Sequence, residues 1–115
     1  RVAHVVLPTY ALEHKIPVAS FLRKLRKSPK FSKDPPPAVW GVPNTWSFPF
    51  DLPPQWLGIP ITGYLKPDAE IPWRDEIDYE VLEIADVGKP FVEASFFHKK
   101  SKSLIVTDVV YQIPQ

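Results

Sequence analysis

The sequence VAHVVLP at residues 2–8 is a nearly continuous apolar run that ends at a proline. Such a run is typical of a strand buried on both faces of a sheet, so it predicts a central strand. After a turn over residues 9–15, Pro17 can occupy a first helical position, and apolar residues recur at i, i+3, i+4 and i+7 from Val18. We expect an amphipathic helix that ends near residue 28, because Pro29 cannot continue it.

The remaining chain predicts short strands, a long loop and a hairpin. Residues 34–60 are rich in proline and tryptophan and leave room only for extended structure, with a short strand at 38–42. Residues 59–65 predict another short strand, and the acidic stretch 68–86 predicts a surface helix over 75–84. Residues 91–98 and 103–111 flank a charged tip, which indicates a β-hairpin. The prediction is one α/β domain spanning residues 1–115.

Composition excludes several classes of site. The chain has 115 residues and no cysteine, so it holds one core and neither disulfides, thiolate metal sites nor a cysteine nucleophile. With only 4 glycines it carries neither the Gly-x-Ser-x-Gly elbow of hydrolases nor a phosphate-binding glycine loop. No apolar run reaches the roughly 20 residues that cross a bilayer. The chain begins inside a predicted strand, which is compatible with a mature form whose targeting segment has been removed.

Two groups of side chains are candidates for binding a partner. The first is basic and lies on and after the predicted helix: Arg23, Arg26, Lys27 and Lys30, with Lys24 and Lys33 beside them. The second is aromatic and lies in the proline-rich stretch: Trp46, Phe48, Phe50 and Trp56. A net charge of +1 argues against a nucleic-acid partner and leaves an acidic protein, an anionic lipid or a merely solvated helix face. Tryptophan is frequent at interface hot spots, although packing within the chain is the alternative for these rings.

Residues 7–14, LPTYALEH, resemble the site where hydrolases of the metallo-β-lactamase fold carry His-x-His-x-Asp-His after a buried strand. The four motif positions are then occupied by Thr9, Ala11, Glu13 and His14. Residues 95–108 resemble the hairpin of that fold which ends in a metal-bridging aspartate, here Asp108. Together with WSFP at 46–49 and LP at 52–53, these segments are similar to a family of cyanobacterial and plastid proteins distantly related to the fold. The resemblance implies half of a metallo-β-lactamase-like sheet.

The departures from the motif decide what the resemblance implies for chemistry. Thr9 and Ala11 replace two imidazoles that would bind zinc, and Lys89 follows Gly88 where a further histidine is usual. The vestigial metal positions that remain are Glu13, His14 and Asp108. Too few ligands are left for a zinc site, so we expect no metal, no cofactor and no catalysis.

The function expected from this resemblance is that of a non-catalytic binding subunit. Its partners would be protein subunits of a large thylakoid membrane complex in the chloroplast, with an algal photosystem I as the first candidate. The protein would dock on the stromal face, peripheral to the membrane, and would bind no nucleic acid. The alternative is a divergent metallohydrolase of the same fold whose missing ligands come from sequence outside this chain.

Overall fold

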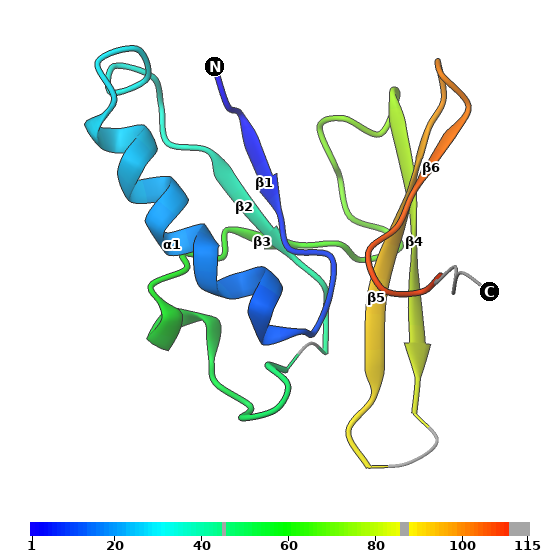
Figure 1. Ribbon diagram of the computed structural model, residues 1–115. Helices are drawn as coiled ribbons and strands as arrows, with labels where there is room; N and C mark the ends of the chain where they lie inside the picture. Colours follow the sequence, from blue (N-terminus) through cyan, green and yellow to red (C-terminus); the bar gives the residue numbers. More distant parts are fainter. Residues whose placement is uncertain (45, 86–87, 111–115) are drawn as a thin grey trace, which may run out of the picture.

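Two three-stranded sheets and one α-helix form the α/β architecture that the sequence predicts (Figure 1). The computed structural model describes residues 1–44, 46–85 and 88–110. In Figure 1 the helix lies on one side of the first sheet and the second sheet stands on the other side. The layers are therefore helix, parallel sheet and antiparallel sheet.

The first sheet is parallel and contains β1 (His4–Val6), β2 (Ala38–Gly41) and β3 (Gly63–Tyr64), in that order. The predicted strand at 38–42 is confirmed, and the one at 59–65 is reduced to two residues. The prediction of a central first strand is wrong, because β1 is an edge strand of this sheet and its residues are only half-buried. Beyond β1, the chain crosses to the second sheet, where Thr9 forms a bridge with Glu93.

The helix α1 spans Leu12–Lys27 and begins ahead of its predicted start. Pro17 lies inside it rather than at its first position. Pro17 is the sixth residue of α1 and lies beyond the four N–H groups that have no partner within a helix, so it removes the one hydrogen bond that an N–H there would donate to the carbonyl of Glu13. The helix ends before Pro29 as predicted. Val18 is buried against the sheet, whereas Phe21 is 42% exposed and lies off the apolar face.

The second sheet is antiparallel and contains β4 (Ile77–Ile84), β5 (Phe91–His98) and β6 (Ser103–Ile105), with β5 in the middle. The predicted hairpin is confirmed, with a second strand shorter than expected; the predicted end at residue 111 lies outside the described residues. The surface helix predicted over 75–84 is wrong, because this segment is β4. All eight residues of β4 pair with β5, and a continuous ladder outweighs the weak helical period of an isolated stretch.

Two apolar clusters hold the three layers together. The cluster between α1 and the parallel sheet contains Leu7, Val18, Val39 and Ile59. The cluster between the two sheets contains Val42, Leu65, Ile71, Tyr79, Val92 and Ala94. Trp40 of β2 packs against the second cluster.

The segment that follows β1 joins the two sheets. The N–H of Ala94 donates a hydrogen bond to the carbonyl of Pro8 (2.7 Å), and Thr9 forms an isolated antiparallel bridge with Glu93. Residues 8–10 and β6 thus lie along the same side of β5. This junction brings the start of α1 close to the end of the final hairpin.

The proline-rich stretch folds against the start of α1. The N–H of Leu12 donates to the carbonyl of Phe48 (3.1 Å), and Ala11 forms a parallel bridge with the same residue. A short 3₁₀ helix, η1 (Pro54–Leu57), follows and contacts α1. The chain passes close enough there that a Cβ on Gly58 would lie 3.5 Å from the Cβ of Ala19.

Candidate functional site

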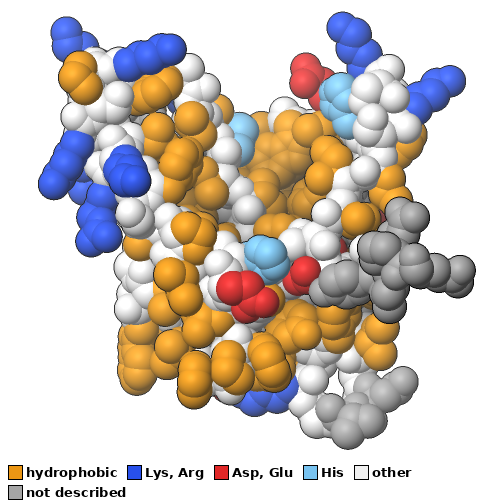
Figure 2. Space-filling view, in the orientation of Figure 1, with side chains coloured by type: hydrophobic (Ala, Val, Ile, Leu, Met, Phe, Trp, Pro, Cys, Tyr) orange, Lys and Arg blue, Asp and Glu red, His pale blue; other side chains and the backbone are white. Residues whose placement is uncertain are grey.

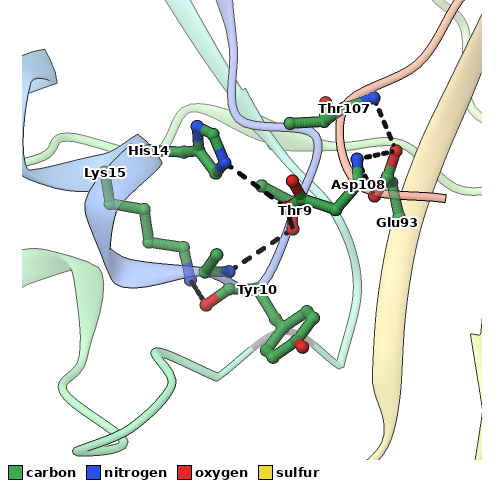
Figure 3. A network of polar contacts seen from close by, with 8 residues as sticks. Thr9, Tyr10, His14, Lys15, Glu93, Thr107 and Asp108 are labelled. Carbon is green, nitrogen blue, oxygen red and sulfur yellow. Dashed lines mark hydrogen bonds and ion pairs between the residues drawn. The ribbon is translucent and has the colours of Figure 1, made fainter. Parts of the chain in front are cut away.

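The segment between β1 and α1, together with the first turn of α1, carries the residues that the resemblance aligns with the four positions of the metal-binding motif. Thr9 and Ala11 are buried, with 1% and 5% of their surfaces exposed, and Glu13 is exposed. His14 points from α1 toward the segment that follows β6 (Figure 3). Thr9 and His14 thus face the same small region beside β5 (Figure 3).

Asp108 completes this group from the far end of the chain. The hydroxyl of Thr9 donates a hydrogen bond to Oδ2 of Asp108 at 3.4 Å, and Nε2 of His14 lies 3.3 Å from the same oxygen (Figure 3). The structure therefore brings two of the three vestigial positions, His14 and Asp108, into direct contact. Within the described ranges, Glu13 has no hydrogen bond or ion pair with either of them.

Glu93 orders the turn that presents Asp108, and the sequence reasoning missed it. Its side chain is fully buried, and its Oε1 accepts a hydrogen bond from the N–H of Thr107 at 2.7 Å. The N–H of Asp108 donates to both carboxylate oxygens of Glu93, at 3.0 and 2.8 Å. Charged acceptors for backbone N–H groups make strong hydrogen bonds. The available signal was a carboxylate between the apolar residues Val92 and Ala94 of a strand.

These donors do not fit a resident zinc ion. His14 and Asp108 supply one imidazole and one carboxylate, whereas the hydroxyl of Thr9 is a poor substitute for imidazole and Ala11 offers no ligand atom. The second carboxylate nearby, Glu93, is occupied by backbone N–H groups. Among the described residues no three histidine, cysteine, aspartate or glutamate side chains are grouped to hold a metal ion.

Lys15 is a second polar feature that the sequence reasoning missed. Only 3% of its surface is exposed, and its ammonium donates to the carbonyls of Trp46 (2.5 Å) and Tyr10 (3.3 Å) and to Oγ of Ser47 (3.2 Å). Burial lowers the pKa of Lys15 from 10.5 to about 8. The available signal was a lysine four residues after Ala11 and three before Val18, on the apolar stripe of the helix.

Lys15 and Ser47 do not form a nucleophilic pair. The hydroxyl of Ser47 is fully buried and donates its own proton to the carbonyl of Leu52 at 2.8 Å. Its oxygen accepts from Lys15, so the lysine is a donor to the serine and does not take its proton. The pair instead fastens the loop of residues 46–52 to the start of α1.

Trp46 is held within the molecule. Its ring stacks on Tyr10 at a centroid distance of 5.6 Å, and its indole N–H donates to the carbonyl of Pro90 at 2.9 Å. The ammonium of Lys89 lies 5.2 Å from the centre of this ring and also pairs with Asp51. Lys89, which replaces the expected histidine, thus contributes to packing of the loop.

The other predicted aromatic residues are exposed beside α1. The exposed fractions are 51% for Phe48, 70% for Phe50 and 78% for Trp56, and Ile16 of α1 is 61% exposed. We call these four residues the aromatic surface. In Figure 2, hydrophobic side chains gather over the lower part of the helix side of the molecule and basic side chains over its upper part. The predicted basic residues Arg23, Arg26, Lys27 and Lys30 are all exposed.

Comparisons with known proteins identify a family. The model of the family described as "Domain of unknown function (DUF4336)" matches residues 1–115. Neither a curated protein nor a solved structure matches the chain. In the part of the chain that the structure describes, no helix has the length and apolar character needed to span a membrane.

Proposed function

We propose that this chain, which belongs to the DUF4336 family, is a non-catalytic subunit that docks on a larger protein assembly. The observation that carries the proposal is the aromatic surface, where a tryptophan, two phenylalanines and an isoleucine are each more than half exposed. Clustered large apolar side chains on a soluble surface are typical of interaction sites. Tryptophan contributes strongly to such interfaces because it buries much area with few rotatable bonds.

The backbone that presents these rings is fixed before any partner binds. Lys15 and Ser47 tie down residues 46–52, and Pro49, Pro53 and Pro54 restrict the backbone around the exposed rings. A surface that is already ordered loses less conformational entropy on binding. This arrangement favours recognition through a rigid loop.

The residues at the vestigial motif positions support a role without chemistry. Asp108 is engaged by Thr9 and His14, and Glu93 is engaged by the N–H groups of residues 107 and 108. Each carboxylate is thus used in contacts that join β5, residues 9–14 and the turn at 107–108. Binding is therefore the function that these contacts favour.

The proposed place of action follows from the resemblance to plastid proteins. We propose the stromal face of the chloroplast thylakoid, with the protein subunits of a membrane complex as partners and photosystem I as the first to examine. The exposed basic residues of α1 suit an acidic docking surface, because complementary charge speeds association and orients the partners. The protein would bind at the periphery of such a complex.

Fractionation of the organelle tests the proposal. Wild-type protein is expected to sediment with a large thylakoid assembly and to be released by a salt wash, as blotting would detect. The double variant Phe50→Ser/Trp56→Ser is expected in the soluble fraction, whereas the control Leu104→Ser, which changes a 65%-exposed residue on the second sheet, stays bound. Recovery of all wild-type protein in the soluble stroma, free of any assembly, would rule the proposal out.

One observation favours a metallohydrolase as the second candidate. His14 and Asp108 converge although they are far apart in sequence, as they would in a metal-binding ancestor. Such an enzyme would need imidazoles supplied from outside the chain. Metal analysis of purified full-length protein separates the two functions: near-stoichiometric zinc or iron, lost in Asp108→Ala, would favour the hydrolase.

A further inference from the structure

A small apolar groove lies at the C-terminal half of α1, away from the aromatic surface. It holds about 230 Å³. Its walls are Leu22, Leu25 and Arg26 of the helix, Phe31, Ser32 and Asp34 of the following turn, and Val2, Pro35, Pro36, Pro37 and Pro60. Pockets for drug-sized molecules hold roughly 300–1,000 Å³, so this groove suits one or two side chains. We call it the basic groove, for the charges around it.

The cations near the basic groove form no ion pairs with carboxylates of the described residues. The stretch from residue 23 to 33 contains six of them and no acid: Arg23, Lys24, Arg26, Lys27, Lys30 and Lys33. All six are exposed, and none forms an ion pair with a described carboxylate. Elsewhere Arg74, Lys89 and Lys99 each pair with an aspartate. Asp34, which lines the groove, is the residue after Lys33, so six cations face one carboxylate over residues 23–34, on the side of the molecule where Figure 2 shows basic side chains around hydrophobic ones.

The groove itself has little freedom to collapse. Four of its lining residues are prolines, which fix the backbone, and the turn is held by the N–H of Ser32 donating to the carbonyl of Ser28 at 2.8 Å. The ammonium of Lys30 lies 5.4 Å from the ring centre of Phe31, which lines the groove. A rigid apolar slot beside exposed cations matches a ligand with one apolar anchor and several negative charges.

We propose that the basic groove binds an acidic peptide segment of a partner protein, with one apolar side chain of that segment inserted in the groove. This inference rests on the proposed function and names the chemistry of the partner. An extended peptide is favoured over a nucleic acid, because the slot is apolar and the net charge of the whole chain is only +1. The aromatic surface is a separate contact site.

Fluorescence anisotropy with a defined probe tests the inference. The probe is a labelled short peptide of glutamates with a central leucine–phenylalanine pair, added to the full chain. Binding is expected to weaken steeply between about 0.05 and 0.5 M salt. A peptide whose glutamates are replaced by lysines, and an all-glutamate peptide without the apolar pair, are each expected to bind about tenfold more weakly or worse.

Matched variants locate the site. Arg26→Glu reverses one charge at the groove and Ser32→Trp fills it, and each is expected to weaken binding of the probe about tenfold. Lys100→Glu makes the same charge change at the hairpin tip and is expected to leave binding unchanged. Thermal unfolding confirms that each variant is folded; a variant that does not fold is replaced by Lys30→Glu.

Three results would overturn the inference: equal binding of the glutamate and lysine peptides, equal loss in Lys100→Glu and Arg26→Glu, or binding to vesicles of anionic lipid with none to the peptide. Failure of the peptide to bind, with sedimentation of the protein still dependent on Phe50 and Trp56, would refute the groove inference alone. Loss of sedimentation of the wild type would refute the proposed function instead.

Discussion

The buried lysine predicts an unusual dependence of stability on pH. In the folded protein Lys15 has a pKa of about 8, whereas in the unfolded chain its pKa returns to about 10.5. Between these values the unfolded state binds more protons than the folded state, so the free energy of unfolding increases as pH rises. A difference of about 2.5 pKa units at 1.36 kcal/mol each corresponds to roughly 3 kcal/mol over the whole window.

Two of the three hydrogen bonds of Lys15 survive this titration. A neutral amine still donates two protons, enough for the carbonyls of Trp46 and Tyr10. What changes at high pH is the cost of keeping a charge away from water, which disappears when the proton is lost. The stability gain therefore reflects removal of the desolvation cost of Lys15, reduced only by the loss of its hydrogen bond to Oγ of Ser47.

Urea unfolding followed by tryptophan fluorescence at pH 7, 8, 9 and 10 measures the effect. The variant Lys15→Met lacks the titrating group, and its curve corrects for all other groups that titrate in this range. The stability of the wild type is expected to rise relative to Lys15→Met by roughly 3 kcal/mol as pH approaches 10.5. Parallel pH curves for the two proteins would show that the lysine is not charged and buried as the structure indicates.

Three further predictions concern other contacts. Glu93→Gln is expected to destabilise the protein by about 1.5–3 kcal/mol and to speed amide exchange at Thr107 and Asp108, whereas the exposed Glu80→Gln changes stability by less than about 0.5 kcal/mol. Burial raises the pKa of Tyr79, and the charges of Asp68, Asp78 and Glu80 add to this effect while Arg74 opposes it, so the free energy of unfolding is expected to fall above pH 10. Tyr79→Phe removes the hydrogen bond to the carbonyl of Lys66 and is expected to cost about 1 kcal/mol of stability at pH 7. In urea unfolding at alkaline pH, the stability of this variant should fall less steeply than that of the wild type. Gly63→Ala places a Cβ 2.6 Å from Cζ3 of Trp40 and is expected to lower the free energy of unfolding in urea by about 1–3 kcal/mol. A second substitution, Trp40→Leu, should reduce this cost, whereas additive effects of the two substitutions would contradict a steric clash between the residues.

Local signals in the sequence were sufficient for several elements of the fold. Pro29 disfavours continuation of the helix, because it has no N–H and its ring restricts the preceding residue, and α1 ends at Lys27. The β-rich runs on either side of residues 99–102 likewise form a hairpin through contacts between near neighbours. These predictions needed no information about the rest of the chain.

The error at β4 was a misjudged local signal. Residues 77–81 alternate apolar and polar side chains, with Asp78 and Glu80 between Ile77, Tyr79 and Val81, and such alternation is typical of a strand. In the structure Tyr79 and Val81 pack on the core between the sheets. The early start of α1, in contrast, has a distant cause, since Lys15 is held by a loop 31 residues later in the chain.

The sequence alone determined the α/β class, the positions of the helix end and hairpin, and the scarcity of metal ligands, because each depends on residue type and short spacing. Only the tertiary structure decided that Thr9 meets Asp108 across 99 residues, that Glu93 is buried on backbone N–H groups, and that Trp46 is held within the molecule while Phe50 and Trp56 are exposed. The physical reason is that the burial of a side chain and the pairing of a strand depend on both segments in contact, whereas a stretch of sequence specifies only one of the two.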